Sequence, residues 1–405
     1  MSELYKLPAG WEWKKLGDNK VCSLNMGQSP NSKSYNSNKV GMPFFQGKKE
    51  FGDLYPTVEQ YTIEPKKIAE KGDILLSVRA PVGPTNIANI QCCIGRGLSA
   101  ISPNKENTIT NYLLYFFRNF ELVISNKGKG STFSAITKKE LEETDIPLPP
   151  LAEQKRIVAK LDSLFEKIDK AIELHQQNIT NANTLMASTL DKTFKKLEGE
   201  YGNKTLSDSV ENPKKDIVDG PFGSNLKATE YIQKGVPIIR IQNIQRLEFI
   251  NKDIKFVSEE KAEFLKRHSF IASDIVITKL GEPLGKSCIV PDNLERGIIV
   301  ADIIRVRVDS SKSKNKYIMY AINSAIAINQ FSENSMGSTR QRVKLSIVRD
   351  LKIPLPPLAI QQQTVEYLDS IATKVDKIKQ LNEQKLENLK ALKASILDKA
   401  FRGEL

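Results

Sequence analysis

With 405 residues the chain is long enough for two or three domains, and 40% hydrophobic and 27% charged residues argue against wholesale disorder. An excess of 60 Lys and Arg over 48 Asp and Glu gives a formal net charge of +12, which favours a polyanionic partner such as nucleic acid. No apolar run approaches the roughly 18 residues that span a bilayer, and no signal core is present, so we expect a cytoplasmic protein with no membrane partner.

The N-terminal part of the chain reads as a mixed globular segment, which we call the first head. Two β-type runs, Asp73–Val78 and Leu98–Ile101, lie between clusters of Gly, Pro and Asn that mark turns. The apolar segment Asn111–Ser125 predicts a buried helix. The first head is therefore expected to combine strands and a helix.

A long polar helix follows the first head and recurs at the C-terminus. Ile146–Phe194 and Ile353–Phe401 align without a gap, and 25 of the 49 aligned residues are identical. Each copy opens with Ile-Pro-Leu-Pro-Pro, and proline suits both an extended exit and the first turn of a helix, where its missing N–H needs no partner. The chain is therefore a duplicated unit, with one head before each helix.

The segment between the long helices, which we call the second head, repeats the plan of the first. Tyr317 and Tyr320 reproduce the spacing of Tyr112 and Tyr115. The predicted elements, in the same order as before, are strands at Asp274–Thr278 and Ile303–Val308 and one helix over about Lys316–Phe331. Most surface residues nevertheless differ between the two heads.

An apolar stripe with steps of three and four runs along each long helix, as in the seam of a coiled coil. The stripes comprise Val158, Leu161, Leu164, Ile168, Ala171, Ile179, Ala182 and Leu185 in the first helix, and Val365, Leu368, Ile371, Val375, Ile378, Leu386, Leu389, Leu392 and Ile396 in the second. Because the second head must fit between them, we expect the helices to pair antiparallel, each about 68 Å long for about 45 residues.

His175 and Asn382 occupy equivalent places near the middle of the two stripes. In an antiparallel pair with a pseudo-two-fold axis these positions meet, and a polar pair there can fix the register of the helices. The alternative is that both side chains turn to solvent, and the sequence leaves the two interpretations open.

These patterns predict an α+β fold in which two pseudo-symmetric α+β heads are joined by two long antiparallel coiled-coil helices. The expected boundaries are 1–147 for the first head, 148–198 for the central helix, 199–354 for the second head and 355–405 for the C-terminal helix. A chain built in this way holds two ligands at a set distance.

No motif in the sequence predicts catalysis. The segment Gly281–Ser287, GEPLGKS, is one residue short of a phosphate-binding loop, so a nucleotide-hydrolysing enzyme is a weak hypothesis. The only two histidines, His175 and His268, cannot form a triad or a metal cluster. The four cysteines lack CxxC spacing and are expected to be reduced, buried thiols. The chain is interpreted as a binding protein with no metal site.

Candidate DNA contacts are polar and basic residues in the loops of both heads, since such side chains bond to phosphates and base edges. In the first head they are Ser29, Asn31, Lys33, Tyr35, Gln46, Lys48, Arg79, Arg96, Lys127 and Lys129. In the second head they are Ser224, Asn225, Lys227, Arg240, Gln242, Asn243, Arg246, Lys279, Arg340, Gln341, Arg342 and Lys344. For each residue taken singly, a solvated surface role is the alternative.

Several segments resemble the specificity subunit of type I restriction-modification enzymes, called HsdS. They are the opening LPAGWEWKKLGD, the stretch GSTFSAITKKELEETDIPLPPLAEQKRIVAKLD, the segment DGPFGSNL and the repeated IPLPPLA helix. The resemblance covers essentially the whole chain. Two departures are that the second head lacks a Trp-rich start and that Ile360 stands at the position equivalent to Glu153.

The resemblance implies that the heads are target-recognition domains, each reading one half of an asymmetric, bipartite site in double-stranded DNA. The helices would set the gap and dock two modification subunits. The chain would be non-catalytic and without a cofactor, since S-adenosylmethionine would be used by the modification subunits, and ATP and Mg²⁺ by the partner subunits that include a restriction and translocase subunit. The alternative function is a coiled-coil scaffold that joins two protein ligands without DNA specificity.

Overall fold

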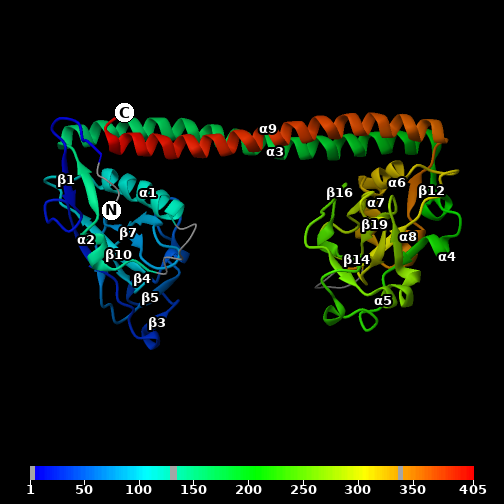
Figure 1. Ribbon diagram of the computed structural model, residues 1–405, viewed down its shortest axis with the longest axis horizontal. Helices are drawn as coiled ribbons and strands as arrows, with labels where there is room; N and C mark the ends of the chain where they lie inside the picture. Colours follow the sequence, from blue (N-terminus) through cyan, green and yellow to red (C-terminus); the bar gives the residue numbers. More distant parts are fainter. Residues whose placement is uncertain (1–4, 128–134, 336–340) are drawn as a thin grey trace. The chain divides into compact units, whose positions relative to one another are not determined.

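The structure, a computed structural model, describes residues 5–127, 135–335 and 341–405, and no side chains within 122–127. The chain divides into two compact units. The first consists of the residues up to Gln176 together with Glu383–Leu405, and the second is Gln177–Asn382. Each unit contains one head and a segment of each long helix, α3 (Leu151–Tyr201) and α9 (Leu358–Arg402) (Figure 1). The α+β fold expected from the sequence is therefore confirmed.

Most strands of the first head form two sheets. The four-stranded antiparallel sheet has the order β2 (Cys22–Met26), β10 (Leu98–Pro103), β7 (Ile74–Ser77) and β8 (Thr85–Ile87). The second sheet has the order β3 (Tyr35–Asn36), β5 (Gln60–Thr62), β4 (Met42–Phe45), β9 (Cys92–Ile94) and β6 (Ile68–Ala69), and in it β4 runs parallel to β9. A separate pair, β1 (Glu12–Lys15) and β11 (Asp145–Leu148), joins the start of the head to its exit.

Helix α1 (Thr110–Lys127) covers the four-stranded sheet and also contacts the long helices. Tyr112, Leu113 and Phe117 are fully buried in one core with Ile101 of β10 and Leu161 of α3. Burying a large apolar side chain stabilises a fold by about 1.5–3 kcal/mol. The core of the first head is thus continuous with the helix that leaves it. A short helix, α2 (Lys138–Glu142), precedes β11.

The second head has a similar arrangement of strands, with a four-stranded sheet in place of the five-stranded one. Its sheets have the orders β13 (Ile217–Asp219), β22 (Ile303–Val306), β19 (Ile275–Thr278), β20 (Ser287–Ile289), and β17 (Lys255–Val257), β14 (Val236–Ile239), β21 (Arg296–Ile299), β18 (Ser269–Ile271). Strand pairs β12 (Asn203–Thr205) with β23 (Lys352–Pro354) and β15 (Ile244–Gln245) with β16 (Glu248–Phe249) complete it. Here β14 runs parallel to β21, as β4 does to β9 in the first head.

The prediction of a single helix over Lys316–Phe331 is wrong, because two helices occupy this segment. Helix α6 (Asn315–Ile322) ends at Asn323, and α7 (Ala325–Glu333) starts after it. The buried Asn323 amide donates to the Ser287 carbonyl of β20 at 2.9 Å, and Asp191 of α3 accepts from the Ala325 backbone N–H at 2.8 Å. These contacts turn the chain between the helices. Three short helices complete the head: α4 (Pro213–Asp216), α5 (Glu259–Phe264) and α8 (Leu345–Arg349).

The long helices pair antiparallel. Within the first unit Arg156 donates to the Leu405 carbonyl and Lys393 pairs with Asp169, so that rising numbers in α3 meet falling numbers in α9. Three expected seam residues, Leu185, Ile378 and Leu392, are instead 39–49% exposed. Met186 and Leu190 of α3 are buried where Leu185 was expected. The apolar spacing alone does not predict these differences in burial, because each long helix buries a different face where it contacts a head. Of the described helices, none is long and apolar enough to cross a membrane.

Candidate nucleic-acid interface

Loops of the first head meet at one end of its two sheets. The Gly27 backbone N–H, just after β2, donates to the Leu98 carbonyl at 2.8 Å, and Gly95 after β9 donates to Phe45 at the end of β4 at 2.8 Å. A Cβ on Gly27 would lie 2.1 Å from the Gly95 carbonyl oxygen, so only glycine permits this approach. The loops after β2, β4 and β9 are thereby held against one another.

Three of the candidate residues come together on these loops: Ser29, Gln46 and Arg96. The Gln46 amide donates to the Ser29 hydroxyl at 3.0 Å, and the Arg96 backbone N–H donates to the same hydroxyl at 3.2 Å. The Arg96 side chain is exposed. An amide and a guanidinium are the groups that bond in pairs to adenine and guanine edges, so this Ser-Gln-Arg cluster has the chemistry of a base reader.

Asn31 and Tyr35 hold a neighbouring loop. The Asn31 side chain accepts from the Lys33 backbone N–H at 3.1 Å, and the Tyr35 hydroxyl donates to the Pro30 carbonyl at 3.0 Å. Tyr35 also stacks on Phe44 of β4, with the ring centroids 4.8 Å apart. Lys33 is exposed between them, where a phosphate contact is open to it.

The other candidates of the first head lie elsewhere. Arg79 is exposed after β7, where its backbone bridges to Ala135. Lys48, two residues after Gln46, lines a pocket between the first head and the long helices. Lys127 is the last residue of α1 and its side chain is not described, and Lys129 lies outside the described residues.

The second head has the same loop frame with different side chains. Gly220 follows β13 as Gly27 follows β2, and a Cβ on Gly220 would lie 1.9 Å from the Val300 carbonyl oxygen. Lys279, directly after β19, bonds through Nζ to Asp219 at 3.0 Å. Its backbone N–H donates to the Asp302 carbonyl at 2.8 Å. Lys279 thereby connects the ends of β13 and β19 to the start of β22.

Arg342 lies beside Lys279. Val343 donates its backbone N–H to the Lys279 carbonyl at 3.0 Å, and the Arg342 guanidinium pairs with Asp302 at 3.0 Å while remaining more than half exposed. Gln341 and Lys344 flank it and are exposed, whereas Arg340 lies outside the described residues. The structure thus brings Lys279, Gln341 and Arg342 to one edge of the second head.

Ser224, Asn225 and Lys227 follow the Gly-Pro-Phe-Gly turn and are exposed. The Asn225 backbone N–H donates to the Phe222 carbonyl at 2.8 Å, which closes the turn. Phe222 itself is 84% exposed. An aromatic ring in this position has a free face, which suits stacking on a base.

Arg240 and Gln242 share one acidic partner. The Asp253 carboxylate accepts from the Arg240 guanidinium at 2.8 Å and from the Gln242 amide at 3.3 Å. Hydrogen bonds from Lys255 and then Arg240 lower the pKa of Asp253 to about 2, so this carboxylate is charged at neutral pH. Arg240 follows β14 as Gln46 follows β4, so equivalent places carry unlike side chains.

The assignment of Asn243 as a direct DNA contact is wrong because the residue is buried, whereas the assignment of the half-buried Arg246 stays a prediction. Asn243 is fully buried, and its amide donates to the carbonyls of Ile250 and Lys252 at 3.0 Å. The Arg246 guanidinium donates to the Asn323 carbonyl between α6 and α7, and burial lowers its pKa. Both side chains thus form hydrogen bonds within the head.

His175 and Asn382 are both half-buried on the long helices. Asn382 accepts a hydrogen bond from Asn178 at 3.4 Å within the second unit. The expectation that His175 and Asn382 meet and fix the register stays a prediction.

The Gly281–Ser287 segment is the turn of a β-hairpin. It joins β19 to β20, which pair antiparallel, and Ser287 is already part of β20. A phosphate-binding loop needs a helix N-terminus after the loop to face the anion, so this segment cannot serve as one. Among the described residues no group of His, Cys, Asp and Glu could hold a metal ion. The four cysteines are free and buried, as expected, and burial raises the pKa of Cys22 and Cys288 to about 12.

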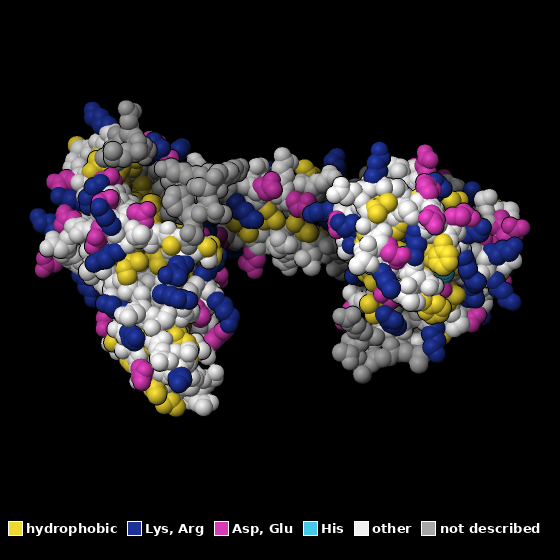
Figure 2. Space-filling view, turned by 60° about the horizontal axis from the view of Figure 1, so that its bottom comes forward, with side chains coloured by type: hydrophobic (Ala, Val, Ile, Leu, Met, Phe, Trp, Pro, Cys, Tyr) yellow, Lys and Arg dark blue, Asp and Glu magenta, His cyan; other side chains and the backbone are white. Residues whose placement is uncertain are grey.

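Sequence reasoning missed the acidic partners of the candidate cations and the exposed ring of Phe222. Asp219, Asp253 and Asp302 each pair with a basic candidate of the second head. Figure 2 shows Lys and Arg side chains interspersed with Asp and Glu on the surface of both heads. The sequence held no signal for the pairs because each joins loops distant in the chain, whereas the Gly-Pro-Phe-Gly turn was a usable signal for Phe222.

The family profile described as "Type I restriction modification DNA specificity domain" matches residues 8–208 and again 214–390. The chain therefore belongs to this family, and it carries the domain twice.

Named relatives agree with the profile. The chain is 47% identical over 168 residues to the specificity subunit assigned to the type I restriction enzyme MjaX of Methanocaldococcus jannaschii, across 42% of this chain and 40% of that protein's length. It is 21% identical to the specificity subunit of the type I restriction enzyme EcoBI of Escherichia coli, across 97% and 86% of the two chains.

Solved structures share the fold. A chain from a study of complex assembly and conformational transition of the type I restriction-modification system superposes with a TM-score of 0.75 at 22% identity, covering 99% of this chain and 100% of that one. The HsdS subunit from Thermoanaerobacter tengcongensis superposes with a TM-score of 0.54 at 22% identity, covering 100% and 99%.

Proposed function

We propose that this chain is the DNA specificity subunit of a type I restriction-modification complex and that it reads an asymmetric, bipartite DNA site, one half with each head. The observation that carries this proposal is the repetition of one loop frame with different side chains. Gln46 and Arg240 occupy equivalent places after β4 and β14, and Ser29 and Phe222 occupy equivalent places after β2 and β13. Unlike readers on like frames recognise unlike half-sites.

The helices α3 and α9 serve in this proposal as the spacer between the half-sites. A helix of 51 residues, as α3 is, extends about 76 Å, which is about two turns of B-DNA. Since α3 connects the first head to the second in the sequence and α9 pairs with it, the length of α3 would limit the gap.

The partners that we propose are double-stranded DNA, two modification subunits and, in the full complex, restriction and translocase subunits. Exposed apolar side chains on the long helices support a docking role; they are Leu174, Leu185, Ile378, Leu381 and Leu392. The modification subunits would use S-adenosylmethionine, and the restriction subunit ATP and Mg²⁺, with no cofactor in this chain. The complex would act in the cytoplasm, where its DNA substrate lies.

A gel-shift titration tests DNA recognition against the scaffold alternative. The chain with its modification subunits should bind a selected split site and lose affinity steeply as salt rises, because phosphate contacts release counterions. A protein scaffold would give weak, non-saturating binding with no preferred sequence. Methylation mapping of DNA from cells that express the chain with its methyltransferase then gives the two half-sites and the gap.

A further inference from the structure

In each unit an equivalent pair of tyrosines bonds to the exit strand of the head and to the long helix that follows it. In the first unit the Tyr112 hydroxyl donates to the Pro147 carbonyl at 2.6 Å, and the Tyr115 hydroxyl donates to the Asp162 carboxylate of α3 at 2.5 Å. Burial, followed by the hydrogen bond to Asp162, raises the pKa of Tyr115, so its hydroxyl is protonated and donates at neutral pH.

The second unit repeats both bonds at the equivalent places. Tyr317 donates to the Pro354 carbonyl at 2.9 Å, and Tyr320 donates to the Asp369 carboxylate of α9 at 2.8 Å. Burial and then Asp369 raise the pKa of Tyr320 in the same way. The first pair of bonds involves α3 and the second involves α9. The two pairs are therefore repeated because the head-and-helix sequence is duplicated.

A buried glutamine in the first turn of each helix adds a third tie. The Gln154 amide donates to the carbonyls of Asn107 and Pro149 at 2.8 and 2.9 Å and accepts from the Ile109 backbone N–H at 3.0 Å. Gln361 makes the matching three bonds in the second unit, at 2.9–3.2 Å. Both side chains are at most 1% exposed. The loop before α1 or α6 is thus fixed to the start of the helix.

The Tyr115–Asp162 and Tyr320–Asp369 contacts, which we call the latches, differ in one neighbouring residue. In the second unit Lys316 donates to the same Asp369 carboxylate at 2.7 Å, so that two donors hold it. The equivalent residue of the first unit is the exposed Asn111, one place before Tyr112 as Lys316 is one place before Tyr317. A charged donor makes a stronger hydrogen bond than a neutral one, so the second latch has the stronger hold on its helix.

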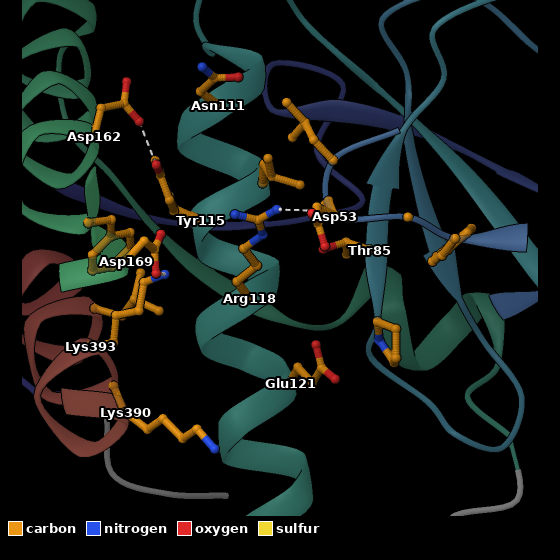
Figure 3. A pocket seen from close by; sticks show the side chains of 18 of the residues that line it. Asp53, Thr85, Asn111, Tyr115, Arg118, Glu121, Asp162, Asp169, Lys390 and Lys393 are labelled. Atoms are coloured by element: carbon orange, nitrogen blue, oxygen red, sulfur yellow. Dashed lines mark hydrogen bonds and ion pairs between the residues drawn. The ribbon is translucent and has the colours of Figure 1, made fainter. Parts of the chain in front are cut away.

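An open pocket of about 990 Å³ lies beside the latch of the first unit. Its walls are α1, the loop around Asp53 and both long helices, as Figure 3 shows, with Asp162 facing Tyr115 on one side and Arg118 facing Asp53 on the other. Side-chain packing does not fill this part of the junction between α1 and the helices. The Tyr115–Asp162 bond therefore holds the angle between them across a partly open contact.

We infer that the Tyr115–Asp162 and Tyr320–Asp369 bonds are positioning contacts that fix the tilt of each head on its own helix segments and so narrow the gap that the protein accepts between half-sites. The inference rests on the proposed DNA-reading function. It assigns Asn111 and Lys316 as the residues that make the first head the less firmly held of the two.

The test selects bound DNA from a library in which the half-sites are constant and the gap length varies, using the chain assembled with its modification subunits. Tyr115→Phe and Tyr320→Phe remove one hydroxyl each and keep the ring, and each should broaden the selected gaps to lengths one base pair shorter and longer, with the half-site sequences unchanged. Asp162→Ala should broaden them as Tyr115→Phe does, and the double variant no further, because both changes break one bond.

A residue swap separates positioning from a general loss of stability. Asn111→Lys gives the first latch the second donor and should narrow the selected gaps, whereas Lys316→Asn should broaden them. Tyr201→Phe, at an exposed tyrosine that ends α3, is the control and should leave the gaps unchanged. If the wild-type complex selects a split site and all of these variants select the same range of gaps as the wild type, the inference is wrong and the proposed function stands. If the wild-type complex selects no split site, the proposed function itself fails.

Discussion

Two residues that look alike in the sequence have opposite roles in the fold. Gln242 and Asn243 are adjacent amides in the second head, yet Gln242 is exposed while Asn243 is fully buried. The Asn243 side chain bonds to three backbone groups of the loop that ends at Asp253. Asn243 therefore positions Arg240 and Gln242 and does not itself read a base.

We predict that Asn243→Ala destabilises the protein by about 1–3 kcal/mol, because it leaves buried backbone groups without a partner. Gln242→Ala is the matched control, and an exposed amide should change stability by no more than about 0.5 kcal/mol. Denaturant unfolding of both variants measures the difference. Equal effects of the two substitutions would show that the loop does not depend on Asn243.

Base contacts at the edge of the second head should affect one half-site alone. We predict that replacing Gln341 and Arg342 with Ala weakens recognition of the second half-site by about 1–3 kcal/mol for each lost base contact. Gln46→Ala in the first head should weaken only the other half-site. Binding to DNA with one half-site randomised at a time measures this, and equal loss at both half-sites after either change would contradict the division of labour.

At the scale of elements, strand pairing decides what a loop can do. The GEPLGKS segment has the composition of a phosphate-binding loop, but β19 and β20 pair antiparallel on either side of it. Its backbone therefore turns between two strands and does not open a helix. Lys286 directly precedes β20 and is half-buried there.

We predict that the pure chain hydrolyses no ATP, and that Lys286→Ala leaves DNA binding and stability close to the wild type. A phosphate-release assay on the isolated chain, with and without DNA, measures the first point. Hydrolysis that the Lys286→Ala variant abolishes would revive the nucleotide-binding interpretation.

At the scale of the whole molecule, the duplication sets the plan. Each unit takes a segment of α3 and a segment of α9, and the first unit buries Phe401 of α9 against Tyr112 where the second buries Phe194 of α3 against Tyr317. These two phenylalanines end the aligned repeats. A duplicated head-and-helix sequence thus gives two units that each need both helices.

We predict that the helices act as a ruler. Inserting one heptad into both helices, after Gln177 and after Gln384, keeps the apolar stripes in phase and adds about 10 Å, or about three base pairs. The half-sites should stay the same while the selected gap lengthens, with DNA bending absorbing part of the change. Selection from the gap library measures it. An unchanged gap in a folded variant that still binds DNA would mean that the helices do not set the distance.

The amino-acid sequence by itself determined the duplication, the α+β heads and the antiparallel helices. Repeated residues and apolar spacing are local in the chain, so they can be read without coordinates. The same locality explains two errors: the helix break at Asn323 depends on Ser287, and the exposure of Leu185 depends on which helix face the second head covers.

Only the tertiary structure decided which polar residues share a surface. Gln46 and Arg96 lie 17 and 67 residues after Ser29 in the chain, and both form hydrogen bonds to it between loops. Composition could not separate Arg342, which lies exposed beside Lys279, from Arg246, which is turned into the head against Asn323. The reason is physical: side-chain chemistry is a property of the residue, whereas burial and partners depend on segments that folding brings together.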